Sequence, residues 1–478
     1  MQSSSLLRTA GRRNGQARAV GGPRLPILAP ASVVVFGNYG NGNLGDEATL
    51  QALLGLLASR VPRAEIVAFA VNPRDTAQRH GIRALPATRL AARATPILSP
   101  SADGPAPLSP RGRAKAALRR VPIVYRALRG GLRVVAALVR LLRDPLLEVR
   151  QLRILRTADC LVIGGGGQLS EPVEVLASFP MQVLKMTLFA KVAGTKVLIL
   201  NVGAIPLERR STRLLVRTAL KLADYCAVRD ERSRSVAERI GAPSPDVYPD
   251  LAYALAPENG SARELTRTVA INVFPHCDGR YLPVAGDRYD TYLERLSELT
   301  IELLRRGYSA MLLQTQLRAD PPALADLKAR LAEKAGWEAV ERQLVERSID
   351  SVDDVLEVLA SSDVVVGTRY HSVVLGFGVG RPVLALAAHV KVAQEMTEMG
   401  QERFLFQIDE ADPAALLTVL EQLEADGYEA ETELARRVAE KRAQLDEEFD
   451  RLFGPVRRDG ASEGFRRDGR RRAVVGSA

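Results

Sequence analysis

Short apolar runs alternate with segments of helical apolar spacing along the first half of the chain. Residues 32–36 (SVVVF) enter a Gly-rich segment, after which residues 49–57 show apolar positions at helical intervals. β-Branched runs of this length are typical of buried strands. Four such runs end in Gly-rich or polar turns before a helix: 32–36, 160–163, 196–202 and 225–228. A fifth strand is expected at 65–69. This repetition predicts an α/β fold with a parallel sheet, whose ligand site lies at the carboxyl ends of the strands.

The same pattern resumes after residues 257–260 (PENG), which we interpret as a linker. Further strands are expected at 269–274, 309–314, 363–366 and 383–387. The chain therefore divides into two Rossmann-like domains with additional segments at both ends. The expected organisation is a disordered leader over 1–30, a first domain over 31–256 with a basic helical insertion at 111–156, a second domain over 261–428, a helix over 429–454 and a disordered basic tail over 455–478.

Composition agrees with a cytoplasmic α/β protein. The 478 residues are 46% hydrophobic but only 5% aromatic, which suits helices packed on a sheet. The three cysteines are far apart and form no CxxC or Cys/His cluster, so neither disulfides nor a metal site is expected. No signal-peptide pattern and no apolar run long enough to span a bilayer is present.

Positive charge is concentrated in the first third of the chain. Residues 1–160 hold 25 Lys and Arg against 8 Asp and Glu, whereas the whole chain has a formal net charge of +10. Within the insertion, five arginines line one helical face: Arg126, Arg129, Arg133, Arg140 and Arg143. Such a face can rest on the anionic inner surface of a membrane, or it can be the solvated face of a packed helix. No specific nucleic-acid partner is indicated.

Two glycine-rich segments follow expected strands. The first, residues 37–46 (GNYGNGNLGD), lies directly before a helix, where glycine backbone and a helix N-terminus together suit an anion or a sugar. It matches neither a Walker A loop nor a dinucleotide fingerprint, and the alternative is a tight turn that only caps the helix. The second is the run of four glycines at 164–167, which serves either ligand contact or close helix packing. The candidate residues are Asn38, Gly42, Asn43, Gly45, Asp46, Gly165, Gly166 and Gly167.

Arginine and histidine also follow strand ends. Arg229 begins the segment RDERS and can bind carboxylate or phosphate, unless it only pairs with a neighbouring acid. Arg369, Tyr370 and His371 occur together in GTRYHS just past an expected strand. An arginine two residues from a histidine suits an anion-binding group beside a proton donor, although a single histidine is often structural. The other three histidines, His276, His389 and His80, are weaker candidates.

In this order, GNYGNGNLGDEATL, LVIGGGGQLSE, AVRDERS and GTRYHSVVLGFGVGRPVLAL resemble the polysaccharide pyruvyl transferase family over residues 32–425. The resemblance implies a GT-B-type arrangement of two Rossmann-like domains, an active site in the cleft between them, and phosphoenolpyruvate as donor without a further cofactor. It implies that the donor is bound by Arg229, Arg369 and Tyr370. It also implies that His371 is the acid/base. Glu171 stands where many members have Asp, and Lys391 lies in HVKV where members have DPKV.

The implied reaction moves a pyruvyl group onto two hydroxyls of a saccharide, in a polysaccharide or a lipid-linked precursor, and releases phosphate. The reaction needs a group that accepts and donates protons, which His371 supplies. It also needs cations that offset the negative charge of the donor, which the arginines supply. One alternative is a sugar-nucleotide glycosyltransferase on the same fold. Another is a non-catalytic scaffold of polysaccharide assembly recruited through the basic segment.

Overall fold

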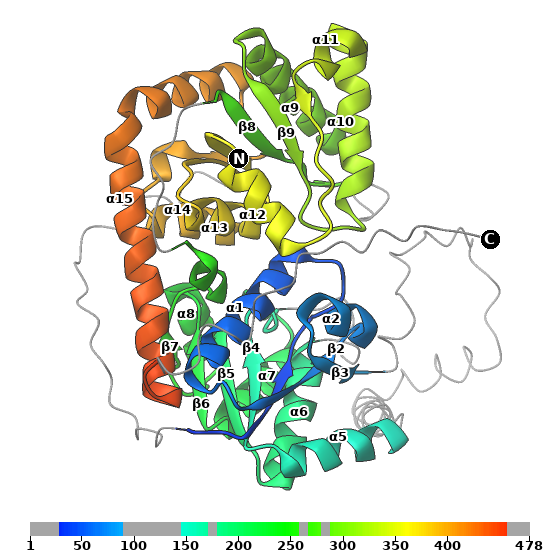
Figure 1. Ribbon diagram of the computed structural model, residues 1–478, viewed down its shortest axis with the longest axis vertical. Coiled ribbons are helices and arrows are strands. Elements are labelled where there is room, and N and C mark those ends of the chain that lie inside the picture. The colour runs from blue at the N-terminus through cyan, green and yellow to red at the C-terminus, as the bar shows by residue number, and fades with distance from the viewer. Residues whose placement is uncertain (1–27, 89–144, 171–178, 258–265, 279–286, 457–478) are drawn as a thin grey trace, which may run out of the picture.

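The computed structural model describes residues 28–88, 145–170, 179–257, 266–278 and 287–456 (Figure 1). Residues 1–27 of the expected leader, the basic tail beyond residue 456 and the five arginines from Arg126 to Arg143 lie outside these residues. The described part forms two α/β domains. No helix among the described residues is long and apolar enough to cross a membrane.

The first domain is built on a seven-stranded parallel sheet in the order β3-β2-β1-β4-β5-β6-β7. Its strands are β1 (Ser32–Phe36), β2 (Glu65–Ala70), β3 (Arg83–Pro86), β4 (Cys160–Gly164), β5 (Lys196–Val202), β6 (Tyr225–Val228) and β7 (Asp246–Val247). The reversal of order beside β1 defines a Rossmann-like domain, and the loops after β1 and β4 lie next to each other there. The expected first-half strands are confirmed; β3 and β7 are additional.

Both faces of this sheet are covered by helices. These are α1 (Leu44–Arg60), α2 (Pro73–His80), α5 (Pro145–Thr157), α6 (Phe179–Ala193), α7 (Arg210–Leu222), α8 (Glu231–Arg239) and the 3-10 helix η3 (Leu251–Leu255). Alternate residues of β1 point to opposite faces, so Val33 and Val35 pack with α1 and η3 whereas Val34 and Phe36 pack with α6. Because both faces are buried, the strand is a continuous apolar run rather than an alternating one.

The second domain repeats this plan with a six-stranded parallel sheet in the order β10-β9-β8-β11-β12-β13. Its strands are β8 (Thr268–Asn272), β9 (Ser309–Leu313), β10 (Leu344–Val345), β11 (Val364–Gly367), β12 (Val383–Ala387) and β13 (Leu405–Gln407). Its helices are α9 (Arg288–Arg305), α10 (Asp320–Ala335), α11 (Trp337–Glu341), α12 (Val352–Ala360), α13 (Tyr370–Gly378), α14 (Val390–Glu398) and the 3-10 helix η4 (Glu402–Phe404). All four expected strands of this domain are present.

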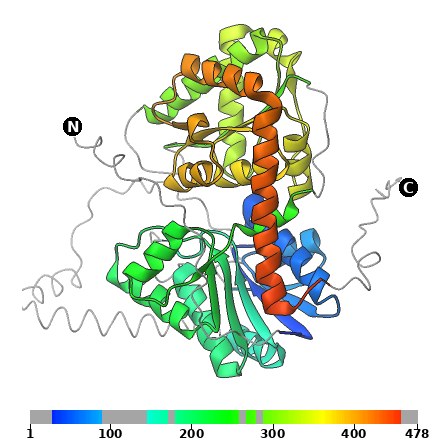
Figure 2. The same cartoon turned by 90° about the vertical axis from the view of Figure 1, so that its left-hand side faces the viewer.

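A single long helix, α15 (Pro413–Phe453), connects the two domains. It begins on the second domain and runs down along the first, as Figure 2 shows. The Asp412 side chain accepts a hydrogen bond from the Ala415 amide, and a proline occupies the first turn, so the helix starts before the boundary expected at 428. At its far end, buried Arg60 of α1 pairs with Asp446 and Asp450, both at 2.8 Å.

The two domains face each other through the carboxyl ends of their sheets (Figure 1). Between β1 and α1, Asn43 forms a β-bridge with Gln316 of the second domain. The Leu44 amide donates to the Thr315 carbonyl at 2.8 Å, and the Leu317 amide donates to the Gly42 carbonyl at 2.8 Å. This is the GT-B arrangement, and it places the loops after β1, β4 and β6 opposite those after β11 and β12.

Candidate active site between the two domains

The loop after β1 positions a buried carboxylate at the start of α1. Asn43 is the N-cap of α1, where its side chain accepts a hydrogen bond from the Gly45 amide. Asp46 in the first turn accepts hydrogen bonds at one oxygen, Oδ2, from the side-chain amides of Asn38 at 2.7 Å and Asn43 at 2.9 Å. Burial raises the pKa of Asp46 to about 6, although the hydrogen bond from Asn38 opposes this shift. A fraction of this carboxyl group therefore carries a proton near neutral pH.

Glycines bring this loop close to the second glycine-rich loop and to the opposite domain. A Cβ at Gly45 would lie 2.0 Å from Nδ1 of His371, so the imidazole ring of α13 packs directly on the backbone of α1. A Cβ at Gly166 would lie 3.0 Å from Oδ1 of Asp46, and both Gly165 and Gly166 have positive φ. The structure thus packs Gly45 against His371 and Gly166 against Asp46, in the turn that follows Gly45.

The remaining glycine-loop candidates lie at the edge of this site. Gly42 has a φ of 70° and contacts the second domain through its carbonyl. Gly167 is exposed and its carbonyl accepts a hydrogen bond from the Ser170 hydroxyl at 2.6 Å. Glu171 lies outside the described residues.

Arg229, directly after β6, is almost completely buried at 7% exposure. Its Nη1 lies 3.3 Å from Oδ2 of Asp250, and its Nε lies 3.4 Å from Oδ2 of Asp230. The guanidinium carbon lies 4.1 Å from the centre of the Tyr370 ring, across the domain boundary. A Cβ at position 203 would collide with this guanidinium at 2.6 Å, so Gly203 is needed to admit it. The Nε of Arg229 has no hydrogen-bond partner, so this donor remains available although two acidic residues lie nearby.

His371 lies in the first turn of α13, with its side chain 12% exposed. Its Nε2 is buried without a hydrogen-bond partner and lies 3.9 Å from Oδ2 of Asp250. Burial, together with the positive charges of Arg229 and Lys391, lowers the pKa of His371 well below its ordinary value. The ring is therefore neutral at physiological pH and can accept a proton.

Lys391, in the first turn of α14, is a second cation of this site and is half-buried. Its Nζ lies 5.6 Å from the centre of the Tyr370 ring, on which Arg229 also packs. Burial and the charge of Arg229 lower the pKa of Lys391 to about 8, while Asp46 opposes this shift. Two cations near one aromatic ring repel each other, and an anion between them would relieve that repulsion.

Arg369 has a different environment from Arg229. Its guanidinium pairs with buried Asp320, with Nε at 3.0 Å from Oδ1, and packs 4.6 Å from the centre of the Phe274 ring. Its backbone amide donates to the side chain of Asn272 at 2.9 Å, which fixes the turn between β11 and α13. Arg369 still adds positive charge to the surroundings of His371.

Four further residues of the site were not expected from the sequence: Asp250, Tyr253, Asp320 and Glu395. Asp250 caps η3 and Asp320 begins α10, so both resemble ordinary helix-start residues in the sequence. The Pro residues beside them, Pro249 and Pro321, mark turns but not a partner in space. Only the fold shows that Asp250 forms an ion pair with Arg229 and that Asp320 forms one with Arg369.

The other histidines are bound elsewhere or lie at the margin. His80 pairs with buried Glu47 at 2.9 Å, and His276 pairs with Asp409 at 2.9 Å. Exposed His389 lies edge-on to Phe274, with ring centres 6.1 Å apart. In the part of the chain that the structure describes, no cluster of three or more His, Cys, Asp or Glu could hold a metal ion.

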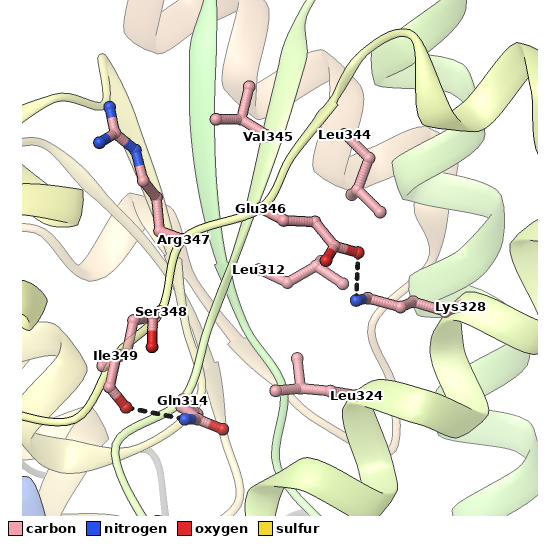
Figure 3. Close-up of a pocket in the computed structure, with 10 residues that line it drawn as sticks. All are labelled: Leu312, Gln314, Leu324, Lys328, Leu344, Val345, Glu346, Arg347, Ser348 and Ile349. Atoms are coloured by element: carbon pink, nitrogen blue, oxygen red, sulfur yellow. Dashed lines mark hydrogen bonds and ion pairs between the residues drawn. The ribbon is translucent and has the colours of Figure 1, made fainter. Parts of the chain in front are cut away.

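A separate cavity of about 190 Å³ lies in the second domain between β9, β10 and α10 (Figure 3). Lys328 and Glu346 pair across it, and the Gln314 side chain donates to the Ile349 carbonyl at 2.9 Å. Its lining includes Leu312, Leu324 and Leu344, and none of the candidate residues contributes to it.

Two Rossmann-like domains thus place Arg229, Lys391 and His371 near Asp46 at their facing strand ends, which is where ligands bind in α/β folds. The family model of polysaccharide pyruvyl transferases matches residues 43–389. The chain therefore belongs to the polysaccharide pyruvyl transferase family, as its motifs indicated. The search of curated proteins returned no match.

Solved structures with similar folds include two UDP-GlcNAc 2-epimerases, one of them putative, and a trehalose-6-phosphate synthase, all of low sequence identity. The UDP-GlcNAc 2-epimerase from Methanocaldococcus jannaschii is 10% identical, with a TM-score of 0.46, covering 82% of this chain and 91% of its own. A putative UDP-N-acetylglucosamine 2-epimerase from Listeria monocytogenes is 12% identical, with a TM-score of 0.48 and coverages of 85% and 91%. The trehalose-6-phosphate synthase OtsA is 13% identical, with a TM-score of 0.47 and coverages of 88% and 97%. These similarities carry no information about the activity of this chain.

Proposed function

We propose that the protein transfers the pyruvyl group of phosphoenolpyruvate to two hydroxyls of a saccharide in a polysaccharide or its lipid-linked precursor. The methylene carbon of the donor takes up a proton, and the first sugar oxygen bonds to the carbon that carries the phosphate. The phosphate C–O bond then breaks, and the second sugar oxygen bonds to the same carbon. Of the two hydroxyl protons, one ends in the new methyl group and the other leaves with the phosphate.

The observation that carries this proposal is a pair of cations at the facing strand ends, buried Arg229 and half-buried Lys391. Arg229 and Lys391 come from different domains and approach the same Tyr370 ring. Asp250 is close to both cations, but Nε of Arg229 has no hydrogen-bond partner among the described residues. Phosphoenolpyruvate carries a carboxylate and a phosphate, which can bind both cations at once. Arg369 strengthens the positive potential while remaining paired with Asp320.

His371 and Asp46 are suited to opposite steps of proton transfer. His371 is neutral and has a free Nε2, so it can accept the proton of an attacking hydroxyl. Asp46, with its pKa raised to about 6, can donate a proton to the methylene carbon. Binding of the anionic donor offsets the charges of Arg229 and Lys391, which raises the pKa of His371 and stabilises the imidazolium once it forms.

The first test is phosphate release from phosphoenolpyruvate by the purified protein with a lipid-linked oligosaccharide extract. We expect acceptor-dependent release that falls by about 100-fold or more in His371→Ala and Arg229→Lys. Arg305→Lys, at an exposed arginine of α9, is the control and should retain the wild-type rate. Absence of release, combined with thermal stabilisation by a sugar nucleotide and not by phosphoenolpyruvate, would establish a glycosyltransferase instead.

A further inference from the structure

Glu395 of α14 joins tyrosines from both domains. Its Oε2 accepts a hydrogen bond from the Tyr370 hydroxyl at 2.9 Å, and its Oε1 accepts one from the Tyr253 hydroxyl at 2.7 Å. Glu395 is only 5% exposed, and both tyrosines are buried. Hydrogen bonds from two hydroxyls to one buried carboxylate are strong, so they hold together the elements that carry the three side chains.

Tyr370 contacts Arg229 directly, and Tyr253 is linked to Arg229 through η3 and Asp250. Tyr370 presents its ring to the guanidinium at 4.1 Å, and Tyr253 lies in the short helix η3 that Asp250 caps. Asp250 in turn binds Nη1 of Arg229 at 3.3 Å. The contacts therefore form a closed circuit from Glu395 through Tyr370, Arg229 and η3 back to Glu395.

The charge that balances Glu395 comes from the connecting helix. Lys441 of α15 places Nζ 3.2 Å from Oε1 of Glu395 and 2.9 Å from Oε2 of Glu398, with its side chain only 12% exposed. Its Nζ also lies 5.2 Å from the centre of the Tyr253 ring. The ion pair with Lys441 and the two tyrosine donors hold the pKa of Glu395 below its ordinary value, so the carboxylate stays charged.

We propose that Lys441 and Glu395 are a positioning pair that fixes Arg229 for donor binding by holding Tyr370 and Tyr253 across the domain boundary. Neither residue reaches the donor itself. The pair makes the donor site dependent on the packing of α15 against α14, because Lys441 of α15 is the cation that pairs with Glu395 of α14. This inference rests on the proposed function, in which Arg229 binds phosphoenolpyruvate.

The test compares Lys441→Met, which keeps the length of the side chain but not its charge, with Lys441→Arg. We expect Lys441→Met to raise the KM for phosphoenolpyruvate by roughly 10-fold or more, with a smaller change in kcat, and Lys441→Arg to recover most of the loss. Arg436→Met is the matched control, because Arg436 lies on the same helix, is exposed, and among the described residues pairs with Glu433 and Glu440 of that helix. Its kinetic constants should be those of the wild type.

Tyr370→Phe provides a second measurement that does not disturb the ion pair. It keeps the ring under Arg229 but removes the hydrogen bond to Glu395. If the positioning acts through this bond, the double variant of Lys441→Met and Tyr370→Phe has about the same KM as either single variant rather than the product of both effects. An unchanged KM in Lys441→Met with a lowered melting temperature, or fully multiplicative effects, would overturn the proposal in favour of a purely structural pair.

Failure of the proposed function has its own signature. If the wild-type protein releases no phosphate, hydrogen exchange of the unliganded protein still tests the circuit. Lys441→Met should then accelerate exchange in residues 225–230 and 366–378, whereas Arg436→Met should not. Unchanged exchange in those segments would refute the circuit itself.

Discussion

Replacing Asp46 with asparagine is expected to stabilise the protein at neutral pH while it removes activity. The substitution keeps the shape of the side chain. Its amide oxygen can still accept the hydrogen bonds that Asn38 and Asn43 donate to Oδ2. What disappears is a buried group that must ionise at neutral pH, and with it the proton that this group can donate.

The magnitude follows from the pKa of Asp46, which burial raises from 3.8 to about 6. A folded-state pKa above the unfolded value means that the folded state binds the proton more tightly, so stability is lost as pH rises through this range. A shift of this size corresponds to about 3 kcal/mol in total, and roughly 2 kcal/mol of it falls between about pH 4.5 and about pH 8. The asparagine variant lacks this loss.

The assay is urea unfolding of both proteins at the two pH values, followed by circular dichroism. The difference in unfolding free energy, variant minus wild type, should increase by about 2 kcal/mol from the lower to the higher pH. Other titrating groups are common to both proteins and cancel in this difference. Phosphate release should fall by about 100-fold or more. A difference in stability that does not change with pH would refute the assignment of a raised pKa to Asp46.

Three further changes test the packing of the site and of the connecting helix. Gly45→Ala should displace the ring of His371, because the new Cβ would lie 2.0 Å from Nδ1, and should lower kcat by about 10-fold or more. Gly55→Ala on the same helix is the control. Its Cβ meets no atom within 4 Å, so this change should stabilise the folded protein by about 1 kcal/mol. Glu448→Gln should weaken the loss of stability that wild type shows as pH rises towards 8, because burial raises the pKa of Glu448 from 4.5 to about 8; an equal loss in both proteins would contradict this. Arg60→Met removes both ion pairs with α15 and should destabilise the protein by about 2 kcal/mol in urea unfolding, and no change would show that these pairs contribute little.

The sequence by itself determined the fold class and most strands. Runs such as 32–36 and 364–366 are apolar on both faces, and such continuous runs between helices are specific to a covered parallel sheet. Very short or partly exposed strands lack this signal, which is why β3, β7, β10 and β13 were not expected. The motifs also resembled the family over residues 32–425, and the family model confirms the membership with a match over residues 43–389.

Tertiary structure alone decided which side chains meet. Gly45 and His371 are far apart in sequence, and only the facing of the two sheets packs one against the other. The same holds for Lys441, whose place on a helix rich in exposed ion pairs hides its buried partner Glu395. Sequence patterns report whether a residue is on the buried face of its own element. They do not report which element lies opposite, because that depends on how two domains and a connecting helix pack together.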